Sequence, residues 1–97
     1  MSRFDQAKML MKMRKLQKEL QKETITAEAG DGAVKVEING EMKIKRISIE
    51  ADSVDTKDIG QLERWLEEAV KDAIAKSQKM AADKMQPMMG SLGSLGL

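Results

Sequence analysis

The first part of the chain carries apolar residues at a helical repeat. Met9, Met13, Leu16 and Leu20 follow a four-three-four spacing, so at about 100° per residue they form one narrow stripe. Most of the residues around them are good helix formers. The basic residues at positions 8, 12, 15, 18 and 22 gather on the side away from the stripe. The pattern predicts a helix over residues 2–22 with one buried edge and one cationic face.

From Thr24 the apolar repeat changes from a helical period to the period of two that is typical of strands. A first strand is expected to end at the turn Gly30-Asp31-Gly32, and Val34, Val36 and Ile38 alternate with charged residues on the return. Asn39-Gly40 predicts a two-residue type I′ hairpin. A third strand is expected over about residues 42–50, with a bulge near Lys45-Arg46 because its apolar phase shifts there. The segment thus predicts a three-stranded antiparallel meander.

A second long helix is expected after the sheet. Asp55 is the predicted N-cap, and the apolar positions that follow the i, i+3, i+4 rule are Leu62, Trp65, Leu66, Ala69, Val70, Ala73, Ile74 and Ser77. Pro87 should end this helix, near Met85, because proline lacks the N–H that continues a helix. Residues 87–97 read as a flexible Gly/Ser/Leu tail on a single domain of residues 1–86. The expected fold class is α+β, in the order α-β-β-β-α.

Composition narrows the possible functions. The chain has 97 residues with no Cys and no His, and Phe and Trp each occur once. Thiolate nucleophiles, most zinc sites and the usual general base are therefore excluded, and we expect no enzyme, no catalytic residues, no metal and no cofactor. No apolar run is long enough for a membrane span, so we expect a cytoplasmic protein with no membrane partner. A core this thin favours a homodimer.

Charge is distributed unevenly although the chain sums to only +1. Residues 1–22 hold seven basic and two acidic side chains, whereas residues 50–72 hold three basic and eight acidic ones. Lysines three and four residues apart advance about 4.5 to 6 Å along a helix, so one face can follow a line of phosphates. The candidate DNA contacts in the first helix are Arg3, Lys8, Lys12, Arg14, Lys15, Lys18 and Lys22, and a second patch is Lys76, Lys79 and Lys84. A solvated, merely solubilising face is the alternative interpretation.

Several stretches resemble the YbaB/EbfC family of small bacterial nucleoid-associated proteins. They include the Met-, Lys- and Gln-rich first helix (Lys8 to Gln21), the run from Ile25 to Gly40, the strand Ile47-Ser48-Ile49-Glu50, and Ala69-Val70-Lys71-Asp72-Ala73. The resemblance implies a homodimer whose sheets form the centre and whose helices project as arms. It further implies duplex DNA binding without enzymatic activity, in nucleoid organisation or gene regulation.

A different class of function remains open from the residues alone. The heptad-like stripe of the first helix and the exposed end of the second could clamp another protein, as an interaction adaptor. The leucine-containing tail is another possible protein-binding segment. The acidic block of residues 50–72 favours this alternative somewhat, because it would repel DNA that came near.

Overall fold

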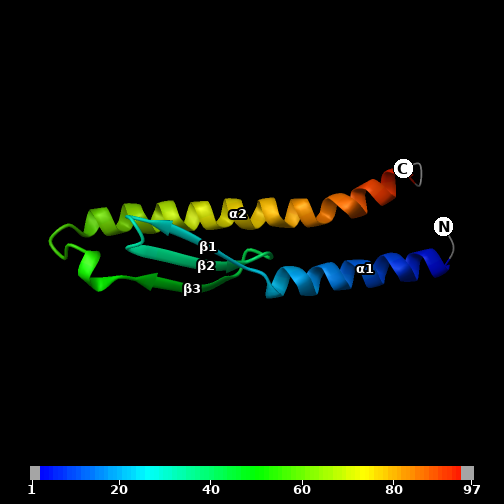
Figure 1. Ribbon diagram of the computed structural model, residues 1–97, viewed down its shortest axis with the longest axis horizontal. Helices are drawn as coiled ribbons and strands as arrows, with labels where there is room; N and C mark the ends of the chain where they lie inside the picture. The colour runs from blue at the N-terminus through cyan, green and yellow to red at the C-terminus, as the bar shows by residue number, and fades with distance from the viewer. Residues whose placement is uncertain (1–2, 95–97) are drawn as a thin grey trace.

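The computed structural model describes residues 3–94, with side chains described as far as Pro87. The elements are α1 (Arg3–Lys22), β1 (Thr24–Ala29), β2 (Val34–Asn39), β3 (Ile44–Ile49), a short 3-10 helix (Ala51–Ser53) and α2 (Ile59–Ser94). Together they make a narrow molecule of 64 × 20 × 15 Å. The sheet lies at one end, and α1 and the second half of α2 project beyond it (Figure 1). The predicted α-β-β-β-α order is confirmed.

The sheet is an antiparallel meander in the order β1-β2-β3. Ala27 pairs with Val36 and Val36 pairs with Ile47, so these three side chains share one face of the sheet. The register between β2 and β3 then shifts, because Glu37 pairs with Arg46 but Ile38 pairs with Ile44. Lys45 is the extra residue, which confirms the predicted bulge.

The turn predicted at Asn39-Gly40 is wrong in type. Among the described residues, the positive φ of this hairpin falls on Met42, at 63°. The Asn39 backbone N–H donates to the Lys43 carbonyl at 2.9 Å, which closes a three-residue loop. Asn39 stands at the entry of the loop, where its side-chain Oδ1 accepts the backbone N–H groups of Glu41 and Lys43. The asparagine therefore organises the hairpin through its side chain.

One face of α2 packs on β1 and β2 and builds the core. Ala69 and Ala73 are fully buried and small, so the helix approaches Val34, Val36 and Ile38 closely. Trp65 covers the β1–β2 turn, where a Cβ on Gly30 would lie 2.5 Å from the indole ring. Gly30 also has a φ of +63°, so both its backbone conformation and the contact with Trp65 favour glycine at this position.

Both ends of α2 differ from the sequence prediction. The helix begins at Ile59 and its cap is Asp58, whose Oδ1 accepts the Gln61 N–H at 3.2 Å. Asp55 caps the turn before it, accepting the Lys57 N–H at 2.9 Å, so the prediction of Asp55 as helix cap is wrong. The predicted end before Pro87 is also wrong, because α2 includes Pro87 and continues to Ser94. The helix bends near this proline (Figure 1), as loss of one backbone hydrogen bond allows. The rest of the predicted tail, residues 95–97, lies outside the described range.

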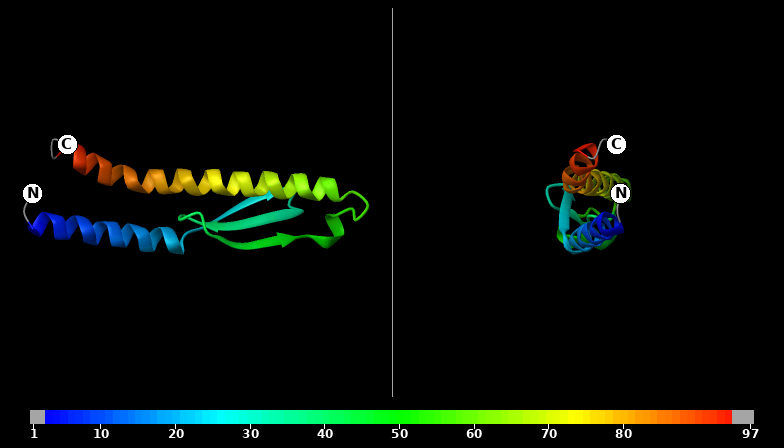
Figure 2. Two further views of the ribbon diagram at one scale, coloured as in Figure 1. Left: turned by 180° about the vertical axis from the view of Figure 1, so that it is seen from behind. Right: turned by 90° about the vertical axis from the view of Figure 1, so that its right-hand side faces the viewer.

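The last turn of α1 is fixed to the β2–β3 hairpin. The Gly40 N–H donates to the Leu20 carbonyl at 2.8 Å, and Leu20 is the buried residue of α1. A Cβ on Gly40 would lie 2.7 Å from Leu20 Cδ2, so only glycine allows this contact. From this anchor, α1 runs alongside the second half of α2 to the same end of the molecule (Figure 2).

Candidate nucleic-acid interface

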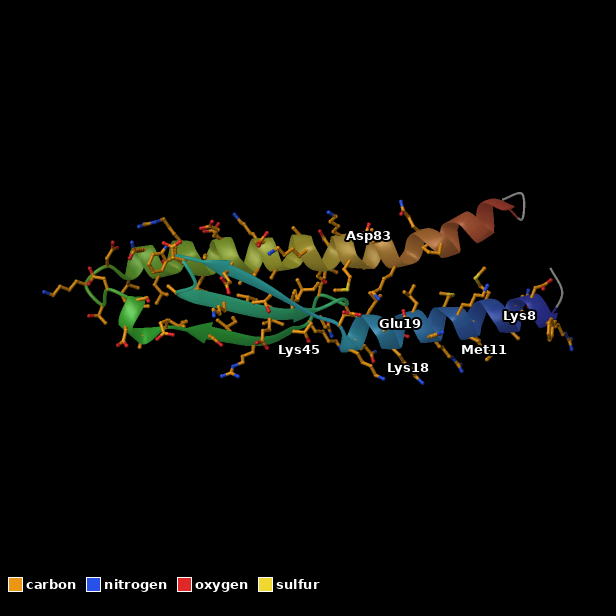
Figure 3. The ribbon with its side chains drawn as sticks, in the orientation of Figure 1. Lys8, Met11, Lys18, Glu19, Lys45 and Asp83 are labelled. Atoms are coloured by element: carbon orange, nitrogen blue, oxygen red, sulfur yellow. The ribbon has the colours of Figure 1, made fainter. Side chains whose placement is uncertain are left out.

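The side of α1 that faces away from α2 is exposed and cationic. The lysines at positions 8, 12, 15, 18 and 22 are all exposed, as are Arg3 and Arg14. Lys18 and Met11 lie on the side away from α2, whereas Glu19 lies between the two helices (Figure 3). The stripe that the sequence placed on the opposite side ends in the buried Leu20. Lys15 and Lys22 lie on the same side as Lys18, whereas Lys8 and Lys12 stand 11 and seven residues before Glu19 and lie on its side of the helix, still exposed to solvent.

Most ammonium groups on this face have no carboxylate partner. Within the described part of the chain, no ion pair within 4.0 Å involves Lys12, Lys15, Lys18 or Lys22. The Lys8 ammonium lies 4.7 Å from the centre of the Phe4 ring, a cation–π contact that keeps its charge exposed. This charge remains available to an external anion.

The predicted second patch is engaged differently. Lys84 lies between the helices, 3.5 Å from the Glu23 carboxylate and 3.9 Å from that of Glu19, and its side chain is only 29% exposed. Lys76 pairs with Asp72 at 3.1 Å. Lys79 is exposed. Lys84 therefore holds α1 beside α2, and it is less accessible than the lysines of α1.

The acidic block lies at the other end of the molecule, around the start of α2. The Lys71 ammonium is 2.7 Å from Glu67, and this hydrogen bond and charge hold the pKa of the Glu67 carboxyl below its ordinary value. Asp55 and Asp58 are occupied as caps. Among the described residues, no group of three or more Asp and Glu side chains could hold a metal ion.

Sequence analysis missed two features of β3. Three isoleucines, Ile44, Ile47 and Ile49, are each 45% exposed on the face that α2 covers elsewhere. Lys43, Lys45 and Arg46 are exposed as well. The predicted bulge could have revealed both features, because its position decides which side chains of β3 share a face.

Comparison with known proteins identifies the relatives of this fold and surface. The model of the YbaB/EbfC DNA-binding family matches residues 2–92. The chain belongs to this family. Nucleoid-associated proteins are among its relatives. One from Chloroflexus aggregans is 37% identical over 87 residues, covering 90% of this chain and 87% of the relative. Another, from Syntrophobacter fumaroxidans, is 39% identical over 86 residues, covering 89% and 78%.

The YbaB/EbfC fold is also found among solved structures. An uncharacterised protein of Helicobacter pylori superposes with a TM-score of 0.73 at 19% identity, covering 86% of this chain and 87% of that one. The family is one of DNA-binding, nucleoid-associated proteins and not a family of enzymes. In the part of the chain that the structure describes, no helix is both long enough and apolar enough to cross a membrane.

Proposed function

We propose that this protein binds duplex DNA as a homodimer, mainly through phosphate contacts, and contributes to nucleoid organisation or gene regulation in the cytoplasm without enzymatic activity. The observation that carries the proposal is the exposed face of α1, where lysine ammonium groups recur every three to four residues, most of them without carboxylate partners. Such a face neutralises phosphates and releases their counterions. The main contacts are Lys8, Lys12, Arg14, Lys15, Lys18 and Lys22.

Sequence selectivity should be low. Lysine presents a compact point charge, whereas arginine and the side-chain amides suit bidentate contacts with base edges. Arg3 and Arg14 are the arginines of α1. Phosphate contacts position a protein on DNA without reading the bases. We therefore expect similar affinities for duplexes of different sequence.

The uncovered apolar surface beside β3 supports the homodimer. The α2 helix contacts β1 and β2, and within the described residues it does not reach β3. Lys76 reaches Thr26 of β1, which identifies the flank of α2 that faces β1. Ile74, on the opposite flank, is 36% exposed and faces toward β3. The flank and the β3 isoleucines form one apolar surface that a second copy would cover.

A salt titration tests the DNA proposal. If a dimer neutralises about six to eight phosphates, log K should fall with log salt at a slope of roughly −5 to −7. Replacing Lys8, Lys12 and Lys15 together by Glu should abolish binding and leave the fold intact, because all of them are exposed. Unchanged DNA affinity in this variant, or a binding constant indifferent to salt, would contradict the proposal.

A protein-binding role for the arms is the second candidate. Two apolar side chains of α1 are largely exposed, because Met13 on the stripe and Leu10 beside it are each 52% exposed. A partner helix could cover these side chains. Replacing Leu10 and Met13 by Gln should leave DNA affinity unchanged if phosphates are bound by the opposite face. Loss of a protein partner in a pull-down, with DNA affinity retained, would favour this second candidate.

A further inference from the structure

The strand β3 carries cations that the bulge turns to one side. Ile44 and Ile47 share the face toward α2, although they are three residues apart, because the bulge adds one residue between them. Lys45 and Arg46, the two residues between these isoleucines, therefore both fall on the opposite face. Lys43 precedes them opposite Asn39. We call these three exposed residues, Lys43, Lys45 and Arg46, the β3 basic patch.

The β3 basic patch adjoins the basic face of α1. The Lys45 ammonium donates to the Thr24 hydroxyl at 3.3 Å, and Thr24 stands two residues after Lys22, the last residue of α1. Figure 1 shows α1 and β3 along the same long side of the molecule, away from α2. Lys18 and Lys45 both lie on that side (Figure 3). The contact with Thr24 thus places the β3 basic patch beside the end of α1, on the same side of the molecule as Lys18.

The acidic groups near the patch leave it with excess positive charge. Glu37 lies opposite Arg46 in the register and is half-buried. Glu28, on the same face of the sheet, pairs with Lys35 at 3.7 Å. Over residues 3–87, where side chains are described, no ion pair within 4.0 Å involves any of the three cations of the patch.

We propose that the β3 basic patch is a second phosphate-binding segment, which extends the DNA contact of α1 past the end of the helix and onto the sheet. This inference rests on the proposed function and deepens it. Lysine and arginine without aromatic neighbours suit the phosphates of a duplex better than stacked bases. The patch lies on the opposite face from the isoleucines, so a dimer formed through them leaves it accessible.

A charge-neutral variant of the full chain tests the patch. Replacing Lys43, Lys45 and Arg46 together by Gln should remove at least one phosphate contact per subunit. The salt slope should then become shallower by about 2 for a dimer, with roughly 60-fold weaker binding at 0.1 M salt. The matched control replaces Lys57, Arg64 and Lys71 by Gln, which removes the same residue types and the same charge at the acidic end. This control should change the affinity less than about threefold.

The outcomes separate this inference from the proposed function. If the wild-type protein shows no salt-dependent DNA binding, both fail. If the wild type binds and the Glu variant of α1 does not, an unchanged slope in the β3 variant overturns the β3 basic patch alone. An equal loss in the matched control also overturns it, since net charge would then explain the effect. A charge-conserving variant that combines K43R, K45R and R46K should keep the wild-type slope.

A measurement on the wild-type protein avoids any variant that fails to fold. Lysine acetylation followed by peptide mass spectrometry, with and without a duplex, reports which ammonium groups the DNA covers. Lys43 and Lys45 should be protected together with Lys18 and Lys22, whereas Lys57 and Lys71 should react equally in both conditions. Protection of the α1 lysines without protection of Lys43 and Lys45 would overturn the inference and leave the proposed function standing.

Discussion

Replacing Ile47 by Lys should separate the proposed dimer while leaving the subunit folded. Ile47 lies in the middle of the exposed isoleucines, with 45% of its surface accessible. Its partner in the register is Val36, which α2 already buries. The core around Ala69 and Ala73 does not depend on the exposed half of Ile47. The far-ultraviolet circular dichroism spectrum should therefore stay close to that of the wild type, whereas the thermal midpoint should fall because the dimer no longer stabilises the folded subunit.

The expected magnitude follows from burial. Fully burying an isoleucine is worth about 1.5 to 3 kcal/mol, so covering the exposed part of each β3 isoleucine is worth about 1 kcal/mol. On each subunit, Ile47→Lys removes this favourable burial energy and places a charge in an apolar contact. We expect a loss of about 3 to 4 kcal/mol per dimer, or roughly a hundredfold to a thousandfold in Kd. Partial escape of the lysine ammonium to solvent is included in the lower value.

Sedimentation equilibrium over a concentration series measures this dissociation constant. The control is Met11→Lys, which makes the same kind of change at a side chain that is 70% exposed on α1, far from β3. Its mass in solution should equal that of the wild type. If Ile47→Lys still sediments as a stable dimer, the β3 surface is not the interface. A monomeric variant should also bind DNA more weakly, because two linked sites bind with higher avidity than one.

Two further substitutions test how the arms are anchored. Gly40→Ala should lower stability by about 1 to 3 kcal/mol in thermal unfolding, because the new Cβ would lie 2.7 Å from Leu20 Cδ2. The control Gly60→Ala should be neutral or slightly stabilising, because its Cβ meets only the ends of the Arg64 and Asp58 side chains, at 3.5 and 3.6 Å. Ser77→Ala should cost about 1 to 3 kcal/mol in urea unfolding, because the buried hydroxyl donates to one backbone carbonyl of the β2–β3 loop and accepts one backbone N–H. Wild-type midpoints in Gly40→Ala or Ser77→Ala would contradict these assignments.

The periodic features of the chain were sufficient to predict the elements. The four-three-four stripe of α1, the alternation of Val34, Val36 and Ile38, and the broad apolar face of α2 each reflect which side of an element must be buried. The bulge followed from the same logic, since β3 can present its isoleucines on one face only with an extra residue. Amphipathic patterning is a property of single elements and can be recognised in a linear sequence.

The features that were missed depend on contacts between distant segments. Asn39-Gly40 has a strong local preference for a two-residue turn. The Ser77 hydroxyl of α2, however, donates a hydrogen bond to the Asn39 carbonyl at 2.7 Å, and Gly40 packs on Leu20 of α1. These tertiary contacts select a longer loop. Likewise, Lys84 was predicted as a DNA contact on the surface. In the structure its ammonium group instead lies beside the carboxylates of Glu19 and Glu23 and connects the two helices. Contacts between residues that are far apart in the sequence cannot be predicted from a local sequence pattern.

The separation of charge along the molecule explains why a net charge of +1 is compatible with binding a polyanion. The Debye length is about 8 Å at physiological salt, whereas the long axis of the molecule measures 64 Å. An anion bound at one end therefore hardly interacts with the charges at the other end. A duplex along α1 and the β3 basic patch would interact with local positive charge, whereas the acids that begin with Glu50, directly after β3, would repel it beyond the patch. The same acids would repel a duplex laid across that end. The acidic block therefore restricts where on the protein DNA can lie, and this favours the side formed by α1 and the β3 basic patch.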